Sequence, residues 1–226
     1  MSWPIVVLIA VGGAGIGAFV LVPALRIIPE PWDPPRAATV AVPVANALLW
    51  GLAANRFSRV WVVLPYLVVF SVLLAVSVVD VRLFRIPDRF VFPGLAATVV
   101  LMVIGSFVVL STTRGALDVL RYAGIGLVTY FGILFVFHVI YPRGMGFGDV
   151  KLAALMGLSL GWLGDSSFAA AYLVLISLFI GCVLGIVFGL TWRLTRREGG
   201  AFPFGPALAA AAIYVVLDVH RYLSGV

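Results

Sequence analysis

Long apolar runs, interrupted by short charged breaks, dominate this sequence of 226 residues. The chain is 63% hydrophobic and carries only 15 basic and 9 acidic side chains. Runs of about 17–25 apolar residues are long enough to cross a bilayer as helices. Inside lipid a spanning segment must satisfy its own backbone hydrogen bonds, which a helix does. The sequence therefore predicts an all-α polytopic membrane protein and excludes a soluble fold.

Reading each uncharged run as one helix gives about eight transmembrane helices. They are expected near residues 3–25, 37–54, 60–79, 90–111, 119–141, 149–163, 168–192 and 203–219. Without an internal repeat or a linker, residues 1–226 are expected to form a single integral membrane domain. The sixth run has only 15 residues, about 22 Å of helix, whereas the hydrocarbon core is roughly 30 Å thick. Its start is therefore expected to be recessed from the membrane surface.

The basic residues indicate how the chain is oriented. When eight spans alternate across the membrane, ten Lys and Arg residues fall on one side and five on the other. The positive-inside rule makes the first side cytoplasmic and places both termini outside. The net charge of +6 consists of single charges scattered among the spans, so membrane lipids are expected partners and nucleic acid is not.

Two acidic residues stand at the ends of apolar runs. Asp80 closes the run 60–79, and Asp149 opens the sixth span within the segment Gly-Phe-Gly-Asp-Val-Lys that begins at Gly146. The topology places both on the cytoplasmic side. A carboxylate pair that shares one proton can activate a water molecule and polarise a peptide carbonyl. Asp80 and Asp149 are therefore the predicted catalytic residues of a membrane aspartyl protease.

The helix ends suggest how the pair divides its roles. Asp149 opens a helix, where the partial positive charge favours the anion, and Asp80 closes one, where the partial negative charge favours the neutral acid. This argument predicts that Asp149 is the more ionised member and that Asp80 holds the proton.

Three segments carry a resemblance to a known family. They are DVRLFRIPDRFVFPG from Asp80 to Gly94, GFGDVKLAALMG from Gly146 to Gly157, and Pro203-Phe204-Gly205-Pro206. In this order they resemble the prepilin peptidases, the type IV leader peptidases of bacteria, which are intramembrane GxGD aspartyl proteases. The resemblance implies that Asp80 and Asp149 are the catalytic aspartates and that the reaction needs no metal or other cofactor.

The resemblance also implies a substrate and a cellular setting. Substrates would be type IV pilin-like, Flp-type or pseudopilin precursors, each with a short basic leader that is removed at the cytoplasmic face of the bacterial inner membrane. Pilus or secretion assembly machinery is a further expected partner. Residues 60–226 would form the catalytic core.

Other residues of these segments have expected supporting roles. Glycines permit a tight turn and a close approach of substrate, and Lys151 either steadies the acids or extends toward lipid headgroups. Pro87 and Asp88 are expected to be structural, with Asp88 capping the helix that follows. The expected substrate-binding residues are Gly146, Gly148, Lys151, Pro203, Phe204, Gly205 and Pro206.

The amino-terminal third, residues 1–59, departs from the longer family members. Its Gly17–Arg26 segment looks like a degenerate family motif, and no cysteine-containing methyltransferase domain follows it. Cys182, the only cysteine, lies in an apolar run. A short peptidase form without methyltransferase activity is therefore expected.

Alternatives remain open on the residues alone. Presenilin-like and signal-peptide-peptidase-like proteases share the Gly-x-Gly-Asp pattern, and their Pro-Ala-Leu element occurs here from Pro206. A small proton-coupled transporter would also keep membrane acids and an intramembrane histidine such as His138. A structural assembly subunit would tolerate loss of both acids. His138 and Asn46 are expected to form hydrogen bonds within the bundle.

Overall fold

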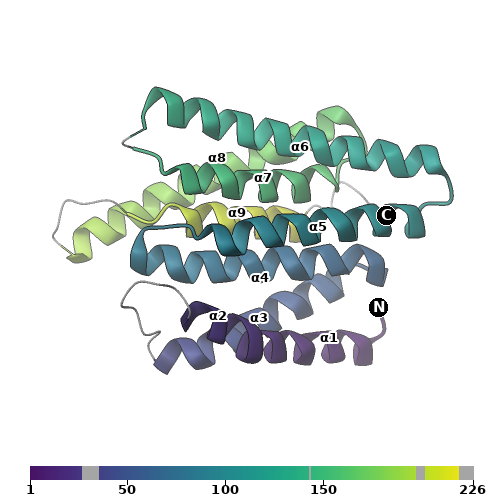
Figure 1. Ribbon diagram of the computed structural model, residues 1–226, viewed down its shortest axis with the longest axis horizontal. Helices are drawn as coiled ribbons and strands as arrows, with labels where there is room; N and C mark the ends of the chain where they lie inside the picture. Colours follow the sequence, from purple (N-terminus) through teal and green to yellow (C-terminus); the bar gives the residue numbers. More distant parts are fainter. Residues whose placement is uncertain (27–35, 143, 197–201, 219–226) are drawn as a thin grey trace.

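The computed structural model describes residues 1–26, 36–142, 144–196 and 202–218, which form a bundle of helices running back and forth along one axis (Figure 1). A π-helical turn, Gly17–Leu21, joins α1 to α2 into one continuous segment. The helices are α1 (Trp3–Ile16), α2 (Val22–Arg26), α3 (Arg36–Arg56), α4 (Val60–Leu83), α5 (Asp88–Val109), α6 (Thr113–Ile140), α7 (Phe147–Gly161), α8 (Ser167–Arg196) and α9 (Gly205–Asp218).

The predicted all-α membrane architecture is confirmed, with helical segments at the eight expected places. Six of these segments are long and apolar enough to cross a membrane, whereas α7 and α9 have 15 and 14 residues. Boundaries differ most from expectation where helices tolerate charges near their ends: α4 continues past Asp80 to Leu83, α8 continues past residue 192 to Arg196, and α6 begins at Thr113, not at residue 119.

The outer surface of the bundle is apolar. Large side chains such as Phe19 on the first segment, Phe179 on α8 and Val128 on α6 are 83%, 70% and 67% exposed. Contiguous exposed apolar surface of this kind is uncommon in soluble monomers and normal against lipid. Cys182 is also exposed on α8.

The short helix α7 lies inside the bundle. Twelve of its 15 residues are buried, and it packs against α4, α5, α6, α8 and α9. The closest approach is to α6, where a Cβ atom on Gly126, Gly157 or Gly161 would overlap the backbone of the other helix. Small residues that let two backbones meet are typical of helix contacts in membranes. Enclosure by protein explains how so short a helix is accommodated in a membrane.

A buried polar network attaches α1 and α3 to α4. The Asn46 amide donates to the carbonyl of Gly13 and accepts from the Ser71 hydroxyl, at 2.8 and 2.9 Å. The Trp50 indole N–H in turn donates to the Ser71 Oγ and the Leu67 carbonyl. The expectation that Asn46 forms hydrogen bonds between helices is confirmed.

The two ends of the bundle gather different connections. At one end α4 and α6 finish and α5, α7 and α9 begin, whereas at the other α3, α5 and α7 finish and α4, α6 and α8 begin (Figure 1). Asp80 in the last turn of α4 and Asp149 in the first turn of α7 therefore lie at the same end, as predicted.

Candidate active site

Asp80 is held between two helices. It lies in the last turn of α4 with 5% of its surface exposed. Its Oδ2 accepts a hydrogen bond of 3.1 Å from the backbone N–H of Gly205, the first residue of α9. A Cβ atom on Gly205 would lie 2.8 Å from the same oxygen. Glycine is therefore required at this position for the carboxylate and the start of α9 to meet.

Asp149 approaches from the opposite wall. It lies in the first turn of α7, is 9% exposed, and its N–H donates to the carbonyl of Gly146. Its Oδ1 is buried and has no hydrogen-bond partner among the described residues. A buried polar oxygen without a partner is costly, so such an atom beside a cavity marks a place where a ligand or water binds.

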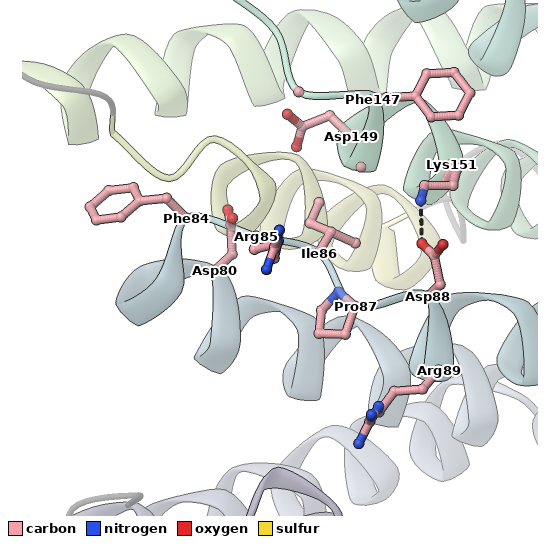
Figure 2. Close-up of a pocket in the computed structure, with 12 residues that line it drawn as sticks. Asp80, Phe84, Arg85, Ile86, Pro87, Asp88, Arg89, Phe147, Asp149 and Lys151 are labelled. Atoms are coloured by element: carbon pink, nitrogen blue, oxygen red, sulfur yellow. Dashed lines mark hydrogen bonds and ion pairs between the residues drawn. The ribbon is translucent and has the colours of Figure 1, made fainter. Parts of the chain in front are cut away.

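The two acids share a cavity of about 630 Å³ at this end of the bundle (Figure 2). Its walls come from the end of α4, the loop and first turn of α5, and the start of α7. It is lined by Asp80, Phe84, Arg85, Ile86, Pro87, Asp88, Arg89, Gly146, Phe147, Gly148, Asp149 and Lys151. The volume falls in the range of ligand-binding pockets.

Ile86 is a site residue that the sequence did not identify. Its side chain is 8% exposed and lies between the two glycine segments, because a Cβ atom on Gly148 would be 2.8 Å from Ile86 Cβ and one on Gly205 3.4 Å from Ile86 Cδ1. Figure 2 shows it in the loop between Asp80 and Asp88. The available signal was an apolar residue between Arg85 and Pro87 in an otherwise charged loop.

Phe84 gives this loop its direction. It ends α4 in the left-handed conformation with φ of 52°, and its N–H donates to the carbonyl of Asp80 at 2.9 Å. Glycine is the usual residue at such a position. Here the phenyl ring meets the Trp192 ring of α8 edge to face, with centroids 6.1 Å apart. The aromatic contact offsets the cost of the backbone conformation and anchors the loop to α8.

His138 positions the segment that leads into α7. Its Nδ1 lies 2.8 Å from the carbonyl of Met145, and because a carbonyl oxygen only accepts, Nδ1 carries the proton in this contact. Its ring also packs against Phe147. The expectation that His138 forms a hydrogen bond within the bundle is confirmed. Among the residues that the structure describes, no group of three His, Cys, Asp or Glu side chains could hold a metal ion.

Lys151 and Asp88 form an ion pair across the mouth of the cavity, which neither side chain was expected to make. The Lys151 ammonium also lies over the rings of Phe92 and Phe147. Asp88 is the first residue of α5, but its carboxylate accepts from Lys151 and no side-chain hydrogen bond caps the helix. The predicted cap is therefore wrong, because Pro87 takes the N-cap position and Asp88 is already inside the helix.

The expected substrate-binding residues separate into two groups. Gly146, Gly148 and Lys151 line the cavity. Within the loop before α9, Gly205 contacts Asp80, whereas Phe204 packs toward Gly185 of α8 and is not part of the cavity wall. Pro203 is buried, and Pro206 belongs to α9. These two prolines also lie outside the cavity wall.

The helix-end argument for the division of roles is incomplete, because it considered only the helix that carries each acid. Asp80 closes α4 but also accepts the first N–H of α9, so it lies at the positive end of a second helix. The partial positive charge at the start of α9 opposes the partial negative charge at the end of α4. Asp149, at the start of α7, has a buried oxygen that receives no donor. The helix ends therefore do not identify the proton holder.

Comparison with known proteins places the chain in a family. Residues 67–190, from α4 to α8, match the model of the type IV leader peptidase family, and this region includes both acids. The chain is 33% identical over 181 residues to a protein of Bacillus subtilis named prepilin leader peptidase/N-methyltransferase. It is 32% identical over 178 residues to proteins of the same name from Pseudomonas aeruginosa and Stutzerimonas stutzeri.

These matches cover 78% of this chain, 64% of the Bacillus protein and 57% of each of the other two. The chain thus spans less than two thirds of the length of the curated relatives it matches. No solved structure matches it significantly. Because the family model matches more than half of the residues, the chain belongs to the type IV leader peptidase family.

Proposed function

We propose that this protein is an aspartic-type endopeptidase that removes the basic leader from type IV pilin-like, Flp-type or pseudopilin precursors. The observation that carries the proposal is the pairing of two buried carboxylates, from α4 and α7, on one cavity at one end of the bundle. Family membership supplies the substrate class, since the curated relatives are named prepilin leader peptidases.

The proposed chemistry uses the two carboxylates as one unit. One ionised carboxylate takes a proton from a water molecule as the water attacks the scissile carbonyl, and the other, protonated, donates to the carbonyl oxygen. The Gly205 N–H fixes the orientation of Asp80, and the unpaired Oδ1 of Asp149 is available to water or substrate. Gly146, where an added Cβ atom would have no contact closer than 3.7 Å, leaves room for an extended substrate strand, whereas Gly148 allows the close approach of Ile86.

Placement at a single end of the bundle favours a hydrolase over a proton-coupled transporter. Acids that guide protons across a bilayer would lie along a path between the two faces. Here both acids line the cavity where α4 ends and α7 begins, and α7 buries most of its remaining length.

The reaction is tested by co-expressing the chain with a candidate precursor and following leader removal by gel shift and mass spectrometry. Asp80→Asn and Asp149→Asn each preserve side-chain size and remove the acid, so both are expected to abolish cleavage. Asp218→Asn, at the far end of α9, is the matched control and is expected to cleave normally. Normal processing by either site variant would exclude that residue from the mechanism.

We further propose that residues 1–226 form one peptidase domain, with 60–226 as its core, and that the chain does not methylate its product. Cys182 on α8 is the single cysteine of the sequence, so these residues contain no cysteine pair. The test incubates the purified chain with a cleaved precursor and S-adenosylmethionine carrying a labelled methyl group. Label on the new amino terminus would refute the peptidase-only assignment.

We propose a cytoplasmic orientation for the site, with both termini outside, in the inner membrane. The end of the bundle that holds Asp80 also carries most of the basic residues, including Arg82, Arg85 and Arg89. In a Cys182→Ser background, Tyr141→Cys marks the site end and Ser111→Cys the other. A membrane-impermeant maleimide is expected to label only the second in intact cells. Labelling of the first alone would reverse the topology.

A further inference from the structure

A second cavity lies at the opposite end of the bundle from the two acids. It encloses about 310 Å³ where α3, α5 and α7 end and α4 and α6 begin. Val109, Tyr122 and Trp162 contribute to its largely apolar wall. Because the 24 residues of α4 extend for about 36 Å between the two ends, a ligand here does not contact Asp80.

Three charged side chains line this cavity: Arg56, Asp118 and Asp165. Arg56 is only partly exposed, and its Nε is buried without a hydrogen-bond partner. Its guanidinium lies over the ring of Phe57, with Cζ 5.1 Å from the centroid. Within the parts of the chain that the structure describes, no ion pair joins Arg56 to Asp118 or Asp165. In these described parts, the cavity thus combines an Arg56 Nε without a hydrogen-bond partner with two carboxylates that form no ion pair.

The rest of the cavity wall contributes few polar groups that could bind a ligand. The Trp162 indole N–H donates to the Ser106 hydroxyl at 2.9 Å, so its polar edge is already satisfied. The position at the end of the helices, where lipid headgroups meet the hydrocarbon, matches an amphiphile with its polar part outward. A ligand that satisfies the charges needs an anionic group for Arg56 and a donor cation for the two acids.

We propose that this cavity binds a phospholipid whose headgroup carries both a phosphate and a primary ammonium, as in phosphatidylethanolamine. The N–H groups of the Arg56 guanidinium would donate to the phosphate oxygens. The carboxylates of Asp118 and Asp165 would accept from the ammonium N–H groups. The apolar wall takes the start of an acyl chain. A purely anionic headgroup would leave both carboxylates without a cation, and a quaternary ammonium has no N–H to donate. The bound lipid joins the ends of α3, α5 and α7 to the start of α6.

Native mass spectrometry of the full-length chain tests the proposal. Protein purified in detergent and depleted of lipid is offered phosphatidylethanolamine, phosphatidylglycerol and phosphatidylcholine with identical acyl chains. The primary-ammonium lipid is expected to be retained at least about tenfold more tightly than the other two, a difference of about 1.4 kcal/mol. Equal retention of phosphatidylglycerol would overturn the proposal.

Variants assign the binding to this cavity. Arg56→Gln is expected to reduce retention of phosphatidylethanolamine at least about tenfold. Arg114→Gln, an exposed arginine at the same end that does not line the cavity, is the control and is expected to bind as the wild type. Unchanged binding by Arg56→Gln would refute the assignment.

Two further arms separate the alternatives. If Arg56→Gln fails to fold, the double variant Asp118→Asn with Asp165→Asn carries the test, and it is expected to lose the preference for phosphatidylethanolamine over phosphatidylcholine. Retention of that preference would contradict the proposal. Water-soluble glycerophosphoethanolamine is expected to compete weakly because it lacks acyl chains. Competition as strong as that of the intact lipid would show that the cavity serves a soluble ligand.

Discussion

Buried polar groups occur in two regions of this bundle, and their hydrogen bonding differs. Between α1, α3 and α4, Asn46 is fully buried. Its amide donates to the Gly13 carbonyl and accepts from the Ser71 hydroxyl, which in turn accepts from the Trp50 indole. At the end of α4, Asp80 receives one N–H, and across the cavity Asp149 has an oxygen with none. A closed network stabilises the packing of helices, whereas an open one is available to a substrate. Both regions are buried, so the difference between them lies in how many hydrogen bonds their polar groups form.

The largest effect is expected from replacing an incompletely bonded acid with an apolar side chain. Asp149→Leu should lower leader cleavage by roughly 10³-fold or more, because the shared proton and the water position are lost. Its melting temperature in detergent should stay the same or rise, since a buried oxygen without a partner is removed. A large fall in the melting temperature would show that Asp149 is structural, and the comparison would then fail.

A second prediction concerns the Gly205 N–H that donates to Asp80. Gly205→Ala places a methyl group 2.8 Å from the carboxylate oxygen, so α9 or Asp80 must shift. Cleavage is expected to fall by roughly 10²-fold, as for other misplacements of about 1 Å. Gly124→Ala, where a Cβ atom meets nothing within 4 Å, is the matched control. Equal activity of the two variants would show that the Gly205 contact does not position Asp80.

Disruption of the closed network around Asn46 should lower stability and leave cleavage activity unchanged. Asn46→Leu leaves the Ser71 hydroxyl without its acceptor and removes the side-chain donor to the Gly13 carbonyl, which should cost about 1–3 kcal/mol of stability. Specific cleavage activity of the folded fraction should remain near that of the wild type. Chemical unfolding in micelles measures the first quantity, with Asn55→Leu on the exposed face of α3 as the control. Loss of activity without loss of stability would link this network to catalysis.

The smallest effect is expected at the ion pair between Lys151 and Asp88, because Asp88 is 57% exposed and exposed pairs contribute about 0–1 kcal/mol. Lys151→Met should therefore change cleavage by less than about fivefold. Rates measured at low and high salt would check the electrostatic origin. A loss of roughly 10²-fold or more would instead indicate that Lys151 contacts substrate directly.

Much of this architecture follows from the amino-acid sequence alone. Helix positions follow from apolar runs, because each lipid-spanning segment must be apolar along its length. Placement of Asp80 and Asp149 at the same end followed from counting those runs, and it is confirmed by the cavity they share. The enclosure of α7 agrees with the inference that a 15-residue run is too short to span alone.

The remaining features of the site depend on contacts between distant segments. The Gly205 N–H at Asp80 joins residues 125 positions apart, and the ion pair between Asp88 and Lys151 joins residues 63 positions apart. No local sequence pattern predicts either contact. The expected cap by Asp88 was wrong because the helix begins at Asp88 itself, whereas the apolar run indicated a start near residue 90.

The contact between Asp80 and α9 has a consequence for biosynthesis. The chain is synthesised from its amino terminus, so both acids are made before residue 205, which supplies the donor to Asp80. The proposed catalytic pair is therefore present in the nascent chain before the backbone N–H that orients Asp80, and the contact forms only once α9 has been made. A full-length chain with Gly205→Pro, which lacks this N–H, would reproduce that immature state for direct measurement.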